Sequence, residues 1–397
     1  MSTPLPPLVE PAAELTREEV ARYSRHLIIP DLGLDGQKRL KNARVLVIGA
    51  GGLGSPTLLY LAAAGVGTIG IVEFDEVDES NLQRQIIHGQ SDIGRPKAQS
   101  ARDSILEVNP LVEVRLHEFR LEPDRAVNLF KQYDLILDGT DNFATRYLVN
   151  DAAVLAGKPY VWGSIYRFEG QVSVFWEDAP DGLGLNYRDL YPEPPPPGMV
   201  PSCAEGGVLG VLPGLIAMIQ ATETLKLLAG VGTPLYGRLL QIDALSMEFH
   251  EFKLKKDPAC PVCGESPSVT ELIDYEGFCG TPAVEPAESA FPEVAASQVA
   301  ARREQGESLL LLDVREADEV ERASIADTMW IPLGSLPERL GELEAWREAP
   351  VVVHCHHGGR SAQACEMLLE RGFRRVENMS GGIEAWSLTV DASVPRY

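Results

Sequence analysis

The pattern of apolar and polar residues in the first half of the chain predicts strands that alternate with helices. Residues 44–49 form a short, β-branched apolar run, which is typical of a strand buried on both faces. A cluster of glycines follows, then a Leu- and Ala-rich helix over residues 56–64 and a second apolar strand over residues 68–74. A third run, residues 133–137, ends at Asp138. Because such alternation builds parallel sheets, we expect an α/β fold with a parallel sheet covered by helices.

The second half repeats this pattern after two segments with little periodicity. Residues 181–207 contain four consecutive prolines and predict a long loop, and an apolar helix is expected behind it over residues 208–228. Apolar runs at residues 308–314 and 350–354 predict two further buried strands, each followed by a helix pattern. The predicted division is a first α/β domain over residues 15–275, a linker over 276–290 and a smaller α/β domain over 291–397.

Composition narrows the class of protein. The chain has 397 residues, a formal net charge of −23 and no run of 18 apolar residues, so neither a membrane span nor broad nucleic-acid binding is expected. The N-terminus shows no basic region followed by an apolar stretch, so we expect a cytoplasmic protein. The six cysteines are scattered, which in a cytoplasmic chain indicates chemistry or metal binding before disulfides.

The glycine cluster has the spacing of a phosphate-binding turn. Gly49, Gly51, Gly52 and Gly54 stand between a predicted strand and helix, where small residues let the backbone approach a phosphate. Glu73 ends the next strand, where an acidic side chain can hold a ribose hydroxyl. By themselves these features favour a nicotinamide or flavin enzyme, and the alternative is a tight turn without a ligand.

Three charged residues downstream do not fit a dehydrogenase. Arg84 follows the second strand, Lys97 lies in the first turn of a predicted helix, and Asp141 lies just beyond the third strand. A lysine in a first turn opposes the helix dipole, so an anionic partner explains it better than helix stability does. Together they suit two phosphate clamps and a magnesium ligand that stabilise charge during attack at phosphorus.

Ordered motifs in this half resemble the MoeB/ThiF family of ubiquitin-activating-enzyme relatives. They are the glycine turn, Ser80-Asn-Leu-Gln-Arg-Gln85, Gly94-x-Pro-Lys97 and Thr140-Asp-Asn142. The resemblance implies an ATP- and Mg²⁺-dependent adenylation of the C-terminal Gly-Gly of a ubiquitin-like sulfur carrier, in a homodimer whose Arg25 reaches the neighbouring subunit's ATP. The implied ATP-binding residues are Gly49, Gly51, Gly52, Gly54, Glu73, Ser80, Asn81, Gln83, Arg84, Lys97, Asp141 and Asn142, with Asp141 on magnesium.

Two cysteine sites in the first half carry separate expectations. Cys203 matches the family cysteine on the loop over the adenylate, where it is covalently linked to the carrier in some relatives or else inert. Cys260 and Cys263 form half of a zinc knuckle, but the family's second Cys-x-x-Cys reads Asn186-Tyr-Arg-Asp189 here. Tetrahedral zinc needs four ligands, so we expect an orphaned pair rather than a zinc site.

The second domain centres on a cysteine that follows a buried strand. Cys355 begins the loop His-His-Gly-Gly-Arg360, and a helix is expected from Ser361. Backbone N–H groups of the loop, the helix N-terminus and Arg360 would stabilise a thiolate on Cys355, which would carry sulfur as a persulfide. Cys365, on the following helix, is expected in the core. The segment resembles a rhodanese domain over residues 291–397, in which Asp313 and Arg315 look structural.

Both halves in one chain resemble MoeZ-type adenylyltransferase/sulfurtransferases, a Rossmann-like adenylation domain followed by a rhodanese domain. The resemblance implies that the carrier is adenylated and then receives sulfur from Cys355, giving a thiocarboxylate. The sulfur donor is a cysteine desulfurase or thiosulfate. Three alternatives stay open: a nicotinamide oxidoreductase with a rhodanese appendage, an activator that passes the carrier on as a Cys203 thioester, and a non-catalytic scaffold.

Overall fold

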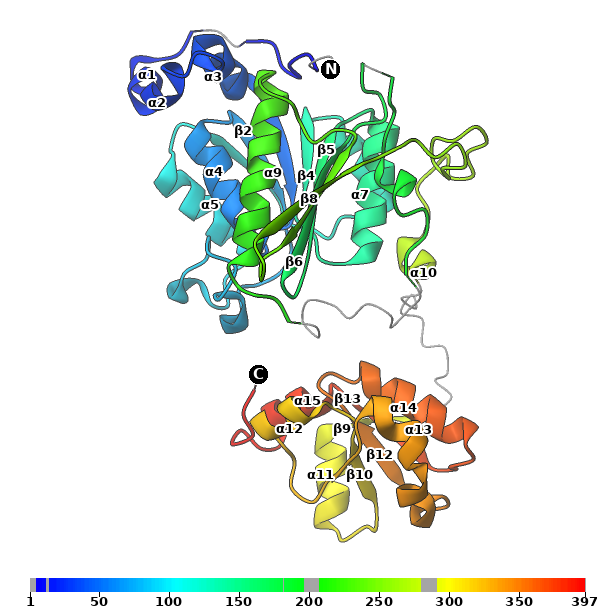
Figure 1. Cartoon of the computed structure of the whole chain (residues 1–397). Helices are drawn as coiled ribbons and strands as arrows, with labels where there is room; N and C mark the ends of the chain where they lie inside the picture. Colours follow the sequence, from blue (N-terminus) through cyan, green and yellow to red (C-terminus); the bar gives the residue numbers. More distant parts are fainter. Residues whose placement is uncertain (1–4, 12–13, 181, 196–206, 280–290, 397) are drawn as a thin grey trace. The chain divides into compact units, whose positions relative to one another are not determined.

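The computed structural model describes residues 5–11, 14–180, 182–195, 207–279 and 291–396, and Cys203 lies outside these ranges. The chain separates into two compact units, Met1–Ala283 and Val284–Tyr397, each with its own sheet (Figure 1). Among the described residues, no helix combines the length and apolarity that crossing a membrane requires.

The first unit is built on an eight-stranded sheet that is parallel over five strands and antiparallel over the rest. The parallel part confirms the predicted sheet, whereas the antiparallel strands were not predicted. In space the order is β3-β2-β1-β4-β5-β6-β7-β8. The strands are β1 Arg44–Ile48, β2 Thr68–Val72, β3 Glu113–His117, β4 Leu135–Asp138, β5 Tyr160–Tyr166, β6 Glu169–Phe175, β7 Arg238–Asp243 and β8 Glu248–Lys253.

Helices cover both faces of this sheet because alternate residues of its central strands are apolar on both sides. Val45 and Val47 of β1 pack into one core with α4 and α9, whereas Leu46 and Ile48 pack into another with α6 and α7. Figure 1 shows α4, α5 and α9 on one side of the sheet and α7 on the other. The helices are α1 Arg17–Arg22, α2 Ser24–Leu27, α3 Gly33–Asn42, α4 Gly54–Ala64, α5 Lys97–Val108, α6 Pro123–Phe130, α7 Phe143–Ala156, α9 Leu212–Ala229 and α10 Tyr275–Phe278, with 3-10 turns η1 Glu79–Asn81, η2 Gln90–Asp92 and η3 Tyr187–Asp189.

A buried ion pair links helix α7 to two later segments of this unit. Arg188 donates two hydrogen bonds of 2.8 Å to the carboxylate of Asp151, and both side chains are almost fully buried. The hydroxyl of Tyr275, in α10, donates to the same carboxylate at 2.7 Å. The three residues therefore connect α7, η3 and α10 through one buried carboxylate.

The second unit has a five-stranded parallel sheet in the order β11-β10-β12-β13-β9. The runs at residues 308–314 and 350–354 form β10 and β12, as predicted, and Cys365 lies in the core. Arg315 is buried and forms an ion pair with Asp313 at the end of β10. The elements are β9 Glu293–Ala295, α11 Ala296–Glu304, β10 Leu310–Asp313, α12 Ala317–Arg322, β11 Met329–Trp330, η4 Leu333–Ser335, α13 Leu336–Arg339, η5 Leu340–Trp346, β12 Val351–His354, α14 Gly359–Glu370, β13 Val376–Ser380 and α15 Gly382–Thr389.

Candidate functional site

The glycine turn joins β1 to α4 and cannot tolerate side chains at two of its positions. Gly49 has φ +92°, a backbone conformation that L side chains rarely adopt. A Cβ on Gly54 would lie 1.9 Å from the carbonyl oxygen of Gly49, so the first turn of α4 packs directly on the end of β1. This close approach leaves the helix N-terminus open toward the carboxyl edge of the sheet, where parallel α/β sheets bind ligands.

A pocket lies at this edge and brings together most of the predicted nucleotide residues. It is bounded by the glycine turn, the ends of β2 and β4 and the first turn of α7. The predicted residues that line it are Gly49, Gly51, Gly52, Glu73, Arg84, Lys97, Asp141 and Asn142.

Glu73 is held in the pocket by the backbone around it. Its Oε2 accepts the N–H of Ala50 at 2.9 Å, and its Oε1 accepts the N–H groups of Phe74 and Asp75 at 2.8 and 3.0 Å. The side chain is only 7% exposed. The carboxylate thus joins the glycine turn to the end of β2 and is fixed before any ligand binds.

The two predicted phosphate clamps approach the pocket from different elements. Arg84 follows η1 and its Nη1 donates to the carbonyl of Ser80 at 3.0 Å. Lys97, at the start of α5, is 7% exposed and its Nζ lies 3.3 Å from Asp75 Oδ2. Asn142 caps α7 by accepting the N–H of Thr145 at 2.9 Å, and Asp141 beside it is exposed. An exposed carboxylate among cationic side chains suits a Mg²⁺–nucleotide complex, because Mg²⁺ prefers oxygen ligands.

Other predicted residues do not line the pocket. Gly54 supports the turn from behind, and Ser80, Asn81 and Gln83 belong to the segment that carries Arg84. Arg25 is exposed on α2. The neighbouring α3 packs at the amino ends of the strands, since the carbonyl of Leu40 accepts the N–H of Gly67 just before β2. Figure 1 shows α2 beside α3, so Arg25, on α2, belongs to the end of the unit opposite the strand ends that line the nucleotide pocket.

Asp138 and Arg146 are two pocket-side residues whose importance sequence reasoning missed. Asp138 Oδ1 accepts from the backbone and hydroxyl of Thr140, while its Oδ2 is buried and has no hydrogen-bond partner among the described residues. Burial raises the pKa of this carboxyl. Arg146 is buried and donates to the Thr140 carbonyl at 3.4 Å. In Asp138-Gly-Thr-Asp141 the sequence pointed to Asp141 as the magnesium ligand, whereas Asp138 is the acidic residue that is buried.

A second, aromatic cavity adjoins the first turn of α7. Phe143 and Arg146 line it, and each lies one residue from a residue that lines the nucleotide pocket. Tyr187 and Tyr191, which lie on either side of the ion-paired Arg188 in the sequence, provide part of its aromatic wall. The cavity has a volume of about 500 Å³ and gives the unit room for a second substrate beside the nucleotide.

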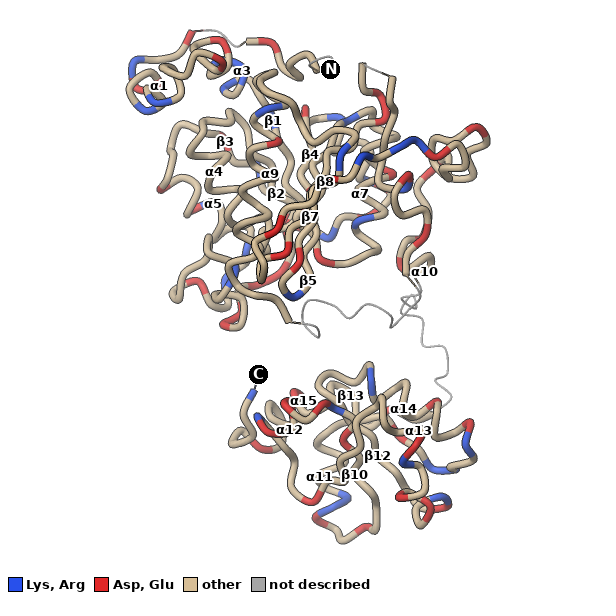
Figure 2. Tube along the Cα trace, in the orientation of Figure 1, with Lys and Arg blue, Asp and Glu red and all other residues tan. Residues whose placement is uncertain are grey.

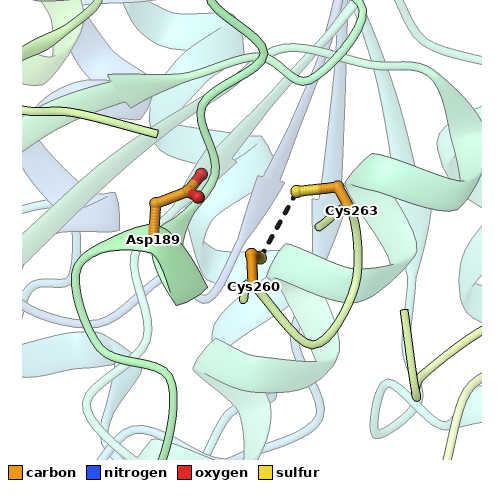
Figure 3. A group of neighbouring side chains, drawn as sticks. All are labelled: Asp189, Cys260 and Cys263. Atoms are coloured by element: carbon orange, nitrogen blue, oxygen red, sulfur yellow. Dashed lines mark hydrogen bonds between the residues drawn. The ribbon is translucent and has the colours of Figure 1, made fainter. Parts of the chain in front are cut away.

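The cysteine pair of the first unit lies beside Asn186 and Asp189, the two residues that replace the family's other pair. Figure 3 shows the pair with Asp189. Ligand atoms of Asp189, Cys260 and Cys263 lie within 4.8 Å of one another. The amide nitrogen of Asn186 lies 2.7 Å from Cys263 Sγ and 3.4 Å from Cys260 Sγ. The Lys256 ammonium also hydrogen bonds to Cys263 Sγ. An ammonium and a neutral amide N–H face the sulfurs, so these residues do not fit a tetrahedral zinc ion.

The loop of the second unit presents Cys355 to backbone donors. Cys355 follows β12 directly, and the N–H of Gly358 donates to its sulfur at 3.1 Å. The hydroxyl of Ser361 lies 3.4 Å from the same sulfur. Gly358 caps α14 with φ +109°, which lets the loop turn its N–H inward. Helix α14 begins at Gly359, two residues before the predicted start.

Arg360 is held by a carboxylate that the sequence did not associate with the loop. Its Nη1 and Nη2 donate to Glu319 of α12 at 2.6 and 2.7 Å. Glu319 therefore neutralises much of the charge that was expected to act on Cys355. The two histidines of the loop, His356 and His357, stack with ring centroids 3.9 Å apart. Burial lowers the pKa of His356 to about 4, so this ring is neutral at pH 7.

Comparisons with known proteins give a separate match for each of the two units. The ThiF family model matches residues 23–262, and a rhodanese-like domain model matches residues 295–389. A probable adenylyltransferase/sulfurtransferase MoeZ of Mycobacterium tuberculosis strain H37Rv is 61% identical, over 100% of both chains. A sulfur carrier protein adenylyltransferase of Thermus thermophilus is 53% identical, over 67% of this chain and 98% of the relative.

A more distant relative and a solved structure extend the comparison. The adenylyltransferase and sulfurtransferase MOCS3 of Sus scrofa is 42% identical, over 100% of this chain and 90% of its own. The crystal structure of E. coli MccB superimposes with a TM-score of 0.55 at 20% identity, covering 62% of this chain and 73% of that chain. At that identity the likeness supports the α/β fold of the first unit.

Proposed function

Since the chain belongs to the ThiF family and ends in a rhodanese-like domain, we propose that it adenylates a sulfur carrier protein with ATP and then transfers sulfur to it. One observation carries this proposal: a chain with a glycine-turn nucleotide pocket also holds Cys355 in a loop of backbone N–H donors. The first site suits activation of a carboxylate, and the second suits sulfur carried on a thiolate.

In the first half-reaction, the C-terminal carboxylate of the carrier attacks the α-phosphorus of ATP. A new C–O–P bond forms, the bond to the β-phosphate oxygen breaks and pyrophosphate leaves. Arg84 and Lys97 stabilise the charge that builds on the phosphates, and Glu73 holds the ribose. Asp141 would hold Mg²⁺, which supplies further charge neutralisation on the phosphates.

The aromatic cavity beside the nucleotide pocket supports a path for the carrier's tail. A Gly-Gly terminus has no side chains, so it can pass between aromatic walls in an extended form. Phe143 and Arg146 line the cavity, and their sequence neighbours Asn142 and Thr145 line the nucleotide pocket. The terminal carboxylate would thereby reach the α-phosphate without opening the sheet.

In the second half-reaction, a persulfide on Cys355 attacks the carbonyl of the acyl-adenylate. AMP leaves, and the carrier is held to Cys355 as an acyl disulfide. A thiol then attacks the Cys355 sulfur and releases the carrier thiocarboxylate, and Cys203 is our candidate for this thiol. The sulfur on Cys355 comes from a cysteine desulfurase or from thiosulfate, acting in the cytoplasm.

The proposal is tested by intact mass spectrometry of candidate Gly-Gly-ending carriers after incubation with the protein, Mg–ATP and each sulfur donor. A gain of about 16 Da, the exchange of oxygen for sulfur, is expected from nucleophilic acyl transfer. Cys355→Ala should abolish this gain and spare carrier-dependent pyrophosphate exchange, whereas Lys97→Met should abolish both. A carrier thioester on Cys203 with no sulfur gain would instead favour the alternative activator, and absence of pyrophosphate exchange with every carrier would contradict the proposal.

We further propose a homodimer in which Arg25 completes the partner's nucleotide site. The placement of Arg25 away from the pocket of its own unit supports this arrangement. Arg25→Ala and Lys97→Met subunits should each be inactive in pyrophosphate exchange. Mixed and reassociated subunits should regain part of the activity, because one hybrid site has both residues. No recovery in a verified mixed dimer would exclude this role of Arg25.

A further inference from the structure

The cysteine pair of the first unit is arranged around an internal cation. Lys256 Nζ hydrogen bonds to Cys263 Sγ and to the carbonyl of Gly184, and it lies 2.9 Å from Glu177 Oε2 and 3.6 Å from Asp189 Oδ2. Hydrogen bonds to Cys263 and Glu177 raise the pKa of Lys256 although burial opposes its charge. The ammonium thus has the sulfur, carboxylate and carbonyl partners that a metal ion would otherwise take.

Both carboxylate oxygens of Asp189, the acidic residue of the cluster, already accept hydrogen bonds from the backbone. Asp189 Oδ2 accepts the N–H of Asn186 at 2.8 Å, and its Oδ1 accepts the N–H of Asp257 at 3.0 Å. A zinc ion would have to displace Lys256 and compete with these backbone donors. The cluster therefore holds its loops together without a metal and leaves both sulfurs chemically available.

The two sulfurs are in contact, and one donates a hydrogen bond to the other. Their Sγ atoms are 3.3 Å apart, with Cys263 donating to Cys260 (Figure 3). The hydrogen bond from Cys263, with help from Asn186, lowers the pKa of Cys260 to about 6, so the pair carries one thiolate at pH 7. Cys260 is buried and Cys263 is partly exposed, which gives a small oxidant access to one side of the pair.

We propose that Cys260 and Cys263 are a redox pair, oxidised by a hydroperoxide to an intramolecular disulfide, with Lys256 as the cation that stabilises the negative charge that develops on Cys263. The pair's thiolate takes one oxygen from hydrogen peroxide, which breaks the O–O bond and leaves a sulfenic acid and, after protonation, water. The second sulfur displaces that oxygen as a second water, and the S–S bond forms. Two thiols and one H₂O₂ give one disulfide and two H₂O.

Two other cysteines provide an internal contrast. Burial raises the pKa of Cys279 to about 11, and burial also raises the pKa of Cys365. Both are therefore thiols at pH 7 and react slowly with peroxide. Oxidation at residues 260 and 263 with Cys279 and Cys365 left as thiols is the signature of the proposed pair.

The test is oxidation of the full-length protein by H₂O₂ at pH 7, followed by alkylation and combined trypsin and Glu-C digestion, which cuts between the pair and Cys279. The peptide 257–265 should lose about 2 Da, the two hydrogens removed by disulfide formation, and regain them with a dithiol reductant. Cys260→Ser/Cys263→Ser should show no such loss.

Lys256→Met should slow the oxidation about tenfold, because Cys263 gives up its proton as the disulfide forms and the variant lacks the cation that hydrogen bonds to its sulfur. Lys255→Met, the same change at an exposed neighbour, and Lys256→Arg, which keeps the charge, should oxidise like the unchanged protein. Equal rates for Lys256→Met and Lys255→Met would overturn the proposal. So would one equivalent of zinc in the purified protein that is lost in the double serine variant, or a disulfide that joins the pair to Cys279.

Discussion

Glu73 allows a ligand role to be separated from a role in holding the protein together. Its carboxylate accepts three backbone N–H groups, from Ala50, Phe74 and Asp75, and it is nearly buried. Glu73→Gln keeps the size of the side chain but leaves only one acceptor oxygen. The best orientation keeps the two bonds from Phe74 and Asp75 and turns an NH₂ group toward the N–H of Ala50.

The cost follows from what that orientation breaks. One charge-assisted hydrogen bond is lost, the remaining two lose their charge, and the buried N–H of Ala50 faces another donor. We expect the free energy of unfolding of the first unit to fall by about 2–4 kcal/mol. For a unit of this size that corresponds to a decrease of about 5–10 °C in its thermal transition. ATP affinity should fall about tenfold, because the glycine turn loses its anchor while an oxygen still faces the ribose.

Thermal unfolding followed by calorimetry, together with ATP titration, measures both effects. Glu76→Gln makes the same change of charge at an exposed position three residues away and should leave both quantities unchanged. A Glu73→Gln protein with unchanged unfolding and ATP affinity reduced more than a hundredfold would refute the reasoning. It would mean that the carboxylate is reserved for the ligand and is not committed to the backbone.

Three further predictions concern the free energy of unfolding, its pH dependence and ATP binding. Arg188→Met should lower the free energy of unfolding by about 3–5 kcal/mol in denaturant titrations, because it leaves Asp151 charged and buried. Arg125→Met, at an exposed ion pair, should lower it by less than about 0.5 kcal/mol. Similar values for the two variants would contradict the importance of the buried pair. Burial lowers the pKa values of His354 and His356 to about 4, so the unfolded chain binds more protons than the folded chain between pH 6.5 and 4. The free energy of unfolding of the second unit should therefore fall by about 1.4 kcal/mol per pH unit per histidine as the pH is lowered through this range. His356→Asn should reduce this slope in pH-dependent melts, and a flat profile for the unchanged protein would refute the reasoning. Gly54→Ala should abolish ATP binding measured by calorimetry, since its Cβ would lie 1.9 Å from a backbone oxygen. Gly214→Ala, where a Cβ would point into open space on α9, should bind ATP normally. ATP binding by Gly54→Ala would show that the turn can move.

The sequence predicted the parallel core because its strands are buried on both faces and bounded by glycines. It did not predict β8, because all six residues of this edge strand are exposed and give no apolar pattern. Strand β3 was missed for a related reason, since its residues are only partly covered. Register in the antiparallel strands β5 to β8 depends on pairing partners, which no local pattern encodes.

The candidate sites divide in the same way. The glycine turn, Lys97 and the Gly358 N–H donor follow from short motifs, because nearby residues make their geometry. Glu319 could not be linked to Arg360, since the pair joins residues 41 positions apart on different elements. Asn186 and Asp189 were expected opposite the cysteine pair, but Lys256 between them follows only from the folded loops.

The hydrogen bond from Tyr275 to Asp151 has a consequence for where this polypeptide can be cut. Tyr275 lies in α10, and its ring is buried with Tyr147 and Phe278 in the same core cluster. A fragment that stops at residue 274 would expose that cluster and leave a buried carboxylate short of one donor. The shortest self-sufficient first unit therefore runs through Phe278. A force that pulls on the chain from its C-terminal side would act on α10 before it acts on the sheet.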